Sequence, residues 1–268
     1  EDGIIRGIVT TSSYEARAQG VRTAMSLSEA FKLCPSLRVK APNMQLYQKL
    51  SHQLHAYLQK RIPMIEQASI DEFYVDLSGW VNDDEALFFV DTLRHEILRD
   101  LDLPVSIGVA KSRHIAKLAT TMAKPFGCKL IRTEEIPAFV EPIKIESFAG
   151  IGRAMQLFLH KYHINTLGDL LRAKELLYNH TPYSKELYKR VSGEDSDELV
   201  TKVPRKSIGI SRTFKAERDR VEMKRRIIIL SRHLAYAILK HDVMPTTFQL
   251  TIRYEMNNKA HANLSRNT

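Results

Sequence analysis

Two adjacent acidic residues, Asp71 and Glu72, constrain this chain more than any other feature because they lie between two short runs of β-forming residues. The runs cover residues 65–70 and 73–77 and predict a hairpin with both carboxylates in its turn. Two like charges about 4 Å apart repel by roughly 4 kcal/mol at an effective dielectric near 20. A bound divalent cation would remove that cost, whereas an exposed acidic turn would tolerate the pair. The dipeptide alone leaves both alternatives open.

Predicted helices and strands alternate on both sides of this hairpin. In chain order the pattern predicts a strand over 4–9, helices over 27–33 and 44–59, the two hairpin strands, a helix over 85–101, a strand over 104–109, a helix over 112–123 and a strand over 128–131. Ser13 or Ser12 is a candidate cap for one turn of helix starting at Tyr14. The alternation predicts an α/β (α+β) fold class in which helices pack on a sheet.

The chain changes character after Glu134, where the pattern becomes helical. From Pro204 onward it predicts a strand over 207–214, a helix over 221–240, a strand over 246–254 and a turn at Asn257 and Asn258 into a further strand. A second domain is therefore expected at the C-terminal end.

Net charge supports a separate C-terminal module. The chain carries a formal charge of +9, and residues 203–268 hold 14 Lys/Arg against 5 Asp/Glu, which accounts for all of the excess. Lysine and arginine gain free energy by displacing counterions from phosphates, so this surplus predicts a nucleic-acid partner. A solvated surface without a partner is the alternative.

Cysteine usage and hydropathy predict a cytoplasmic protein with no membrane partner. The two cysteines, Cys34 and Cys128, have neither metal-binding spacing nor the pattern of a disulfide framework. The apolar run over 227–230 is far too short to cross a bilayer.

The residues around the acidic pair, Ser69-Ile70-Asp71-Glu72-Phe73-Tyr74-Val75-Asp76, resemble the S-[IL]-D-E-x-[YF]-x-D motif of Y-family DNA polymerases. Other stretches resemble further signatures of that family in the family's order, and these are Tyr14-Glu15-Ala16-Arg17, Ser106-Ile107-Gly108-Val109-Ala110, Met122-Ala123-Lys124-Pro125-Phe126-Gly127 and Phe148-Ala149-Gly150-Ile151-Gly152. The resemblance covers essentially the whole chain and is closer to the DinB branch than to the UmuC branch.

This resemblance implies a polymerase palm with a ferredoxin-like βαββαβ-type sheet, small fingers, a helical thumb with a helix-hairpin-helix turn and a partial βαββαβ little finger. The implied domains are fingers over 1–42, palm over 43–132, thumb over 133–199, and linker with partial little finger over 200–268. It also implies that the family's first palm strand, with a third metal-binding Asp and the steric gate, precedes Glu1. The chain by itself is therefore expected to be catalytically impaired.

The resemblance also implies roles for individual residues. Asp71 and Glu72 would be the catalytic residues that hold two Mg²⁺ ions, with Asp76 structural. Nucleotide-binding residues would be Thr11, Tyr14, Arg17 and Lys124, and DNA-binding residues would be Gly150, Gly152, Arg205, Lys206, Arg212 and Lys215. Ordinary structural roles remain the alternatives: a surface helix position for Arg17, a helix-dipole contact for Lys124 and a tight turn for the two glycines.

The function implied is that of an error-prone translesion DNA polymerase, which adds deoxynucleotides to a primer by two-metal nucleotidyl transfer. Its partners would be primer–template DNA and a deoxynucleoside triphosphate, and a sliding clamp is a candidate partner of the full-length protein. A monomer is expected. The alternatives are a non-catalytic DNA-binding protein on a polymerase-like scaffold and another two-metal nucleotidyl-transfer enzyme, such as a cyclase.

Overall fold

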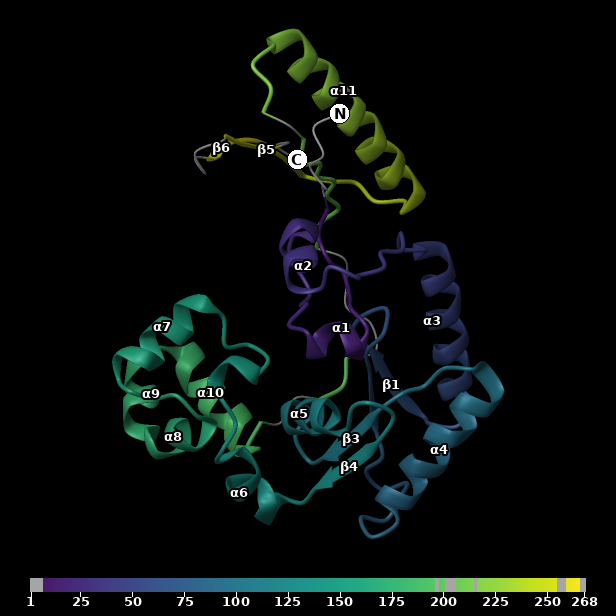
Figure 1. The fold of residues 1–268 in the computed structure, drawn as a ribbon, viewed down its shortest axis with the longest axis vertical. Helices are drawn as coiled ribbons and strands as arrows, with labels where there is room; N and C mark the ends of the chain where they lie inside the picture. The colour runs from purple at the N-terminus through teal and green to yellow at the C-terminus, as the bar shows by residue number, and fades with distance from the viewer. Residues whose placement is uncertain (1–6, 196–197, 201–205, 215, 255–258, 266–268) are drawn as a thin grey trace. The chain divides into compact units, whose positions relative to one another are not determined.

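In the computed structural model, which describes residues 7–195, 198–200, 206–214, 216–254 and 259–265, the chain divides into two units, residues 1–201 and 202–268 (Figure 1). This division falls close to the expected start of the linker and little finger at residue 200. The individual fingers, palm and thumb boundaries stay predictions.

Two short helices form the N-terminal part of the first unit, α1 (Tyr14–Ala18) and α2 (Leu27–Leu33). Ser13 caps α1 as expected, since its hydroxyl accepts the backbone N–H of Ala16. A capping box formed by Ser26 starts α2. The strand expected over 4–9 falls partly outside the described residues, and Ile8 forms an isolated β-bridge. These elements enclose a small core of Val9, Ala16, Val21, Ala30 and Cys34.

The acidic hairpin packs against two long helices. It consists of β1 (Met64–Gln67) and β2 (Phe73–Asp76), which pair antiparallel with Ile65 opposite Val75. The helices are α3 (Met44–Gln59) and α4 (Ala86–Leu101). Their apolar faces and the hairpin bury a common core of Leu54, Leu58, Ile62, Ile65, Leu93 and Ile97. The predicted hairpin and both helices are confirmed to within a few residues.

A parallel strand pair follows, made of β3 (Ile107–Ala110) and β4 (Cys128–Ile131), and α5 (Arg113–Ala123) connects the two strands. Parallel strands need such a crossover, which is usually a helix. The α/β class is confirmed. Among the described residues the four strands lie in two separate two-stranded sheets, whereas the resemblance implied one continuous sheet. Periodicity specifies strands, but which strand edges meet is decided in three dimensions.

Short helices make up the rest of the first unit, and α7 to α10 gather into one bundle in Figure 1. The elements are η1 (Thr133–Glu135), α6 (Ile136–Val140), η2 (Ile145–Ser147), α7 (Arg153–Lys161), α8 (Leu167–Arg172), α9 (Lys174–His180) and α10 (Pro182–Ser192). Their core also includes Ile115, Leu118 and Ala119 of α5. Helix α5 therefore contributes to the core of this helical region as well as covering β3 and β4.

The second unit contains α11 (Arg220–Lys240) and an antiparallel pair of strands, β5 (Thr247–Arg253) and β6 (Lys259–Ser265). The expected helix and the two later strands are confirmed, and the expected turn at Asn257 and Asn258 lies outside the described residues. The strand expected over 207–214 is wrong, because these residues belong to no strand. A strand needs a neighbour to accept its backbone hydrogen bonds, and an alternating sequence does not provide one.

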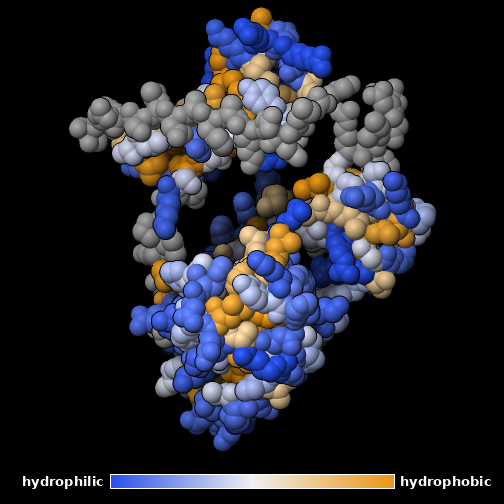
Figure 2. All heavy atoms as spheres, turned by 90° about the vertical axis from the view of Figure 1, so that its left-hand side faces the viewer, coloured by the Kyte–Doolittle hydropathy of each residue, from blue (hydrophilic) through white to orange (hydrophobic). Residues whose placement is uncertain are grey.

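Apolar side chains are exposed at the surface of both units, among a larger number of hydrophilic residues (Figure 2). In the second unit they include Tyr236 and Leu239 of α11, which are 69% and 78% exposed. Over the part of the chain that the structure describes, no helix combines the length and apolarity needed to cross a membrane.

Candidate active site

The acidic pair lies in the tight loop that joins β1 to β2. Backbone N–H groups of Ala68 and Ser69 donate to the carbonyl oxygen of Glu72 at 3.0 and 3.2 Å and close the loop. The Ser69 hydroxyl donates to Asp71 Oδ1 at 2.7 Å. Both acidic side chains are exposed, so the loop presents two carboxylates to solvent or to a ligand.

A lysine from α5 contacts this pair. Lys117 Nζ lies 2.8 Å from Glu72 Oε2. Partial burial disfavours the charged form of Lys117, but the hydrogen bond to Glu72 and the surrounding negative charge, including that of Asp71, outweigh it and raise the pKa of Lys117. The ammonium therefore offsets part of the repulsion between the two carboxylates.

Sequence reasoning did not identify Lys117 as a site residue. A lysine on the polar side of an amphipathic helix is common and gives no signal that would select it as a site residue. Its contact with Glu72 depends on how α5 packs against the hairpin.

Close packing of α5 on β3 fixes where Lys117 lies. Gly108 of β3 has no side chain, and a Cβ there would lie 2.1 Å from the carbonyl oxygen of Ala116 and 2.3 Å from the backbone nitrogen of Thr120. Only glycine allows so close an approach. The absence of a side chain at Gly108 thus sets the distance between α5 and β3.

Three of the expected nucleotide-binding residues form a second cluster, in which Thr11 lies just before α1 and Tyr14 and Arg17 lie in α1. The guanidinium of Arg17 donates from Nε to the carbonyl oxygen of Ser12 at 3.0 Å and from Nη2 to Thr11 Oγ1 at 3.5 Å. It also lies 5.4 Å from the ring centroid of Tyr14. All three expected residues are exposed. The arrangement gathers a cation and two hydroxyls, which suits a phosphate group.

Lys124 ends α5 and is exposed. It lies seven residues beyond Lys117, which is about 10 Å along a helix axis. Among the described contacts, none joins Lys124 to the acidic loop or to the cluster around Arg17. Its role as a phosphate ligand stays a prediction.

The expected DNA-binding glycines lie at the turn that leads into α7. Gly150 adopts a φ of +102°, which L-residues with a side chain rarely adopt, and its carbonyl oxygen accepts a hydrogen bond from the Tyr183 hydroxyl. Gly152 is the N-cap of α7 and has no side chain to cap the helix. The backbone N–H groups of the first turn of α7 therefore have no capping side chain, an arrangement able to bind a phosphate.

Of the expected basic DNA contacts in the second unit, Lys206 and Arg212 are exposed. Arg212 donates to the carbonyl oxygen of Ser211 at 3.3 Å. Arg205 and Lys215 lie outside the described residues.

The acidic loop is suited to a magnesium ion that takes only one or two of its ligands from the protein. Among the described residues no group of three or more His, Cys, Asp or Glu side chains could hold a metal. Magnesium is commonly bound by one or two carboxylates, with water and substrate phosphates as its other ligands. Asp71 and Glu72 fit that donor set.

Comparisons with known proteins show which family the chain belongs to. The profile of the impB/mucB/samB family matches residues 2–121, and the profile of that family's C-terminal domain matches residues 205–268. The DNA polymerase IV of Oceanobacillus iheyensis is 33% identical over 256 residues, which cover 93% of this chain and 61% of the relative. The DNA polymerase IV of Streptococcus gordonii is 32% identical over 253 residues, covering 93% and 72%.

Solved structures share the fold. A Y-family DNA polymerase chimera matches with a TM-score of 0.80 and 24% identity, covering 97% of this chain and 76% of the chimera. DinB from Sulfolobus solfataricus matches with a TM-score of 0.67 and 24% identity, covering 98% and 78%.

Proposed function

Because the chain belongs to the impB/mucB/samB family of DinB-like Y-family DNA polymerases, we propose that the full-length gene product adds deoxynucleotides to a primer on undamaged or damaged template DNA. The observation that carries the proposal is the exposed pair Asp71 and Glu72 in a loop closed by backbone hydrogen bonds. Mg²⁺, taken as two ions, is the proposed cofactor, primer–template DNA and a deoxynucleoside triphosphate are the proposed partners, and the cytoplasm is the proposed location.

In the proposed reaction the primer 3′-hydroxyl attacks the α-phosphate of the nucleotide in line, and pyrophosphate leaves. When bound, Mg²⁺ supplies positive charge that favours a deprotonated nucleophile and stabilises the leaving group. Asp71 and Glu72 would hold the metal. The short loop between two paired strands restricts the movement of both carboxylates, which favours a fixed geometry.

Residues outside the acidic loop would bind the substrates. Thr11, Tyr14 and Arg17 would contact the triphosphate, since a guanidinium binds phosphate oxygens through two parallel hydrogen bonds. Lys124 would add a further positive charge.

DNA binding would rest on backbone and side-chain contacts to phosphates. The N–H groups around Gly150 and Gly152 would bind one phosphate, and Arg205, Lys206, Arg212 and Lys215 would bind others. Such contacts position the duplex without reading its sequence.

Primer extension tests the proposal. The full-length gene product should extend a primer in Mg²⁺, and Asp71→Ala should abolish extension, because a carboxylate that would hold the metal is lost. Asp83→Ala is the matched control, since it removes an exposed carboxylate from a loop outside the site and should leave extension unchanged. Normal extension by Asp71→Ala would contradict the site. If the wild type binds primer–template but adds no nucleotide, the chain is instead a non-catalytic DNA-binding protein.

A further inference from the structure

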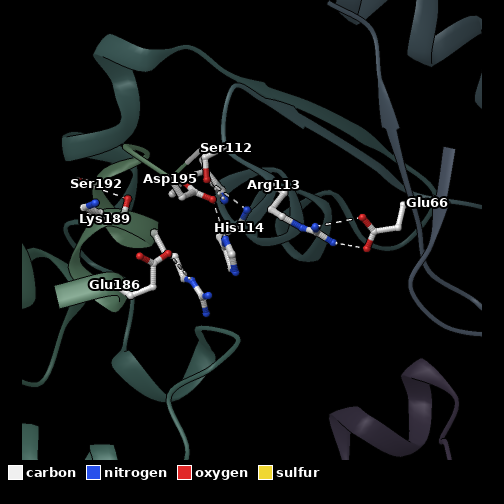
Figure 3. Close-up of polar contacts among 10 residues, drawn as sticks. Glu66, Ser112, Arg113, His114, Glu186, Lys189, Ser192 and Asp195 are labelled. Atoms are coloured by element: carbon white, nitrogen blue, oxygen red, sulfur yellow. Dashed lines mark hydrogen bonds and ion pairs between the residues drawn. The ribbon is translucent and has the colours of Figure 1, made fainter. Parts of the chain in front are cut away.

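Two residues near the end of the first unit contact elements that lie earlier in its chain, and Figure 3 shows the first contact, between Asp195 and His114. His114 Nδ1 lies 2.8 Å from Asp195 Oδ2, and the Asp195 side chain is only 1% exposed. The backbone N–H of Val200 donates to Glu66 Oε2 at 2.8 Å. Asp195 is therefore held against the start of α5, and Val200 is held against β1.

The Glu66 carboxylate, which accepts a hydrogen bond from the Val200 N–H, also pairs with Arg113. Arg113 Nη2 donates to Glu66 Oε1 at 2.7 Å, and Nη1 donates to Oε2 at 3.2 Å. The two side chains are 19% and 12% exposed. Burial disfavours the Glu66 carboxylate, but the hydrogen bonds from Arg113 and Val200 outweigh it and lower the pKa of Glu66. One carboxylate thus joins three segments that are distant in sequence.

Arg113 also contacts the other strand of the hairpin. Its guanidinium carbon lies 4.3 Å from the ring centroid of Tyr74, and Tyr74 is directly opposite Glu66 in the β1–β2 register. The guanidinium therefore holds both strands of the hairpin close to α5.

Two cations of α5 pair with the two ends of the acidic loop. Arg113 and Lys117 are four residues apart, so they lie on the same face of the helix. Arg113 pairs with Glu66, just before the loop, and Lys117 pairs with Glu72 at its end. The position of the loop relative to α5 therefore depends on both ion pairs.

We propose that Glu66 is a positioning residue, which couples the segment around Val200 to the carboxylates of Asp71 and Glu72. This inference rests on the proposed function. The chain continues from Val200 into residues 202–268, which carry the proposed phosphate contacts. A displacement of that segment changes the hydrogen bonding of Glu66, and through Arg113 and Tyr74 it changes the position of the loop that holds the metal. Metal affinity at the loop is thereby linked to the placement of the DNA-binding unit.

Replacing Val200 tests this coupling with little change to side chains. Val200→Pro removes the N–H that donates to Glu66, whereas the control Val200→Ala keeps it. The full-length protein is examined for Mn²⁺ binding by electron paramagnetic resonance in the absence of DNA, and for the Mg²⁺ concentration at half-maximal primer extension. We expect Val200→Pro to raise the Mn²⁺ dissociation constant and the Mg²⁺ concentration at half-maximal extension on the order of fivefold relative to Val200→Ala. The rate at saturating Mg²⁺ and the primer–template Kd without metal should change less than twofold.

A second variant covers the case in which proline disturbs folding. Glu66→Asp keeps the charge beside Arg113 but withdraws the carboxylate by one methylene, and it should produce the same shift in metal affinity. Glu198→Asp is its matched control on an exposed residue of the same segment. Equal metal affinities in Val200→Pro and Val200→Ala, or in Glu66→Asp and Glu198→Asp, overturn the coupling and leave the proposed function standing. A wild type that neither binds Mn²⁺ nor extends primers overturns both.

Discussion

Replacing Gly108 by alanine should lower the stability of the first unit and disturb the acidic loop. A Cβ at this position would lie 2.1 Å from the Ala116 carbonyl oxygen and 2.3 Å from the Thr120 backbone nitrogen. Both atoms belong to the backbone of α5, so no side-chain rotation relieves the overlap and the whole helix has to move away from β3.

The expected size of the effect follows from these contacts. Forcing an extra methyl group into a well-packed interior costs typically 1–3 kcal/mol, and roughly 3 kcal/mol is expected for overlap with backbone. Alanine also reduces the conformational entropy of the unfolded chain, which stabilises the folded state by about 0.5–1 kcal/mol. The net loss of about 2 kcal/mol should lower Tm by roughly 4–8 °C for a domain of this size.

Urea denaturation followed by circular dichroism measures this loss, with Gly209→Ala as the control. Gly209 has open space around its position and an ordinary φ, so its replacement should change stability by less than about 0.5 kcal/mol. Because α5 carries Lys117, Gly108→Ala should also reduce primer extension. A Gly108→Ala protein as stable as Gly209→Ala would refute the argument that backbone contact fixes α5 on β3.

Three further outcomes are expected. Arg17→Ala should raise the KM for the incoming nucleotide roughly tenfold to a hundredfold in single-nucleotide insertion, because a charge-assisted hydrogen bond to phosphate is worth about 1.5–3 kcal/mol; Arg22→Ala, on an exposed arginine nearby, should not. Lys206→Ala should weaken primer–template binding and reduce the slope of log K against log salt by about one, as fluorescence anisotropy would show; an unchanged slope would exclude a phosphate contact. Burial works against the Asp195 carboxylate, but hydrogen bonds from His114 and Ser112 outweigh it and lower its pKa below 3.8, so its stabilising effect is present above that pH and is lost as the pH falls further. The stability difference between wild type and Asp195→Asn should accordingly shrink in urea denaturation below about pH 4, and a difference independent of pH would contradict it.

Much of the fold could be predicted because its signals are local. The helices over Leu27–Leu33 and Met44–Gln59 have the predicted bounds, since apolar spacing and the prolines that follow specify them. The prediction of a strand over 207–214 was wrong for the opposite reason. Its alternation is a local property, whereas a strand requires a partner that only the folded chain can supply.

The residues of the candidate site likewise include some that the sequence could identify and one that it could not. Asp71 and Glu72 could be selected from the sequence, because the residues around this adjacent acidic pair resemble a motif of Y-family DNA polymerases. Lys117 could not, because a lysine on a helix is common and its significance comes from a 2.8 Å contact across 45 residues of chain.

Neighbouring residues and composition were enough to predict the hairpin with its acidic loop, most of the helices and the concentration of positive charge after residue 202. Tertiary structure alone decided that the strands lie in separate pairs, that Lys117 meets Glu72 and that Glu66 joins Arg113 to Val200. Hydrogen bonds and ion pairs between distant residues depend on how helices and strands pack, and one glycine that lets α5 approach β3 helps to set that packing.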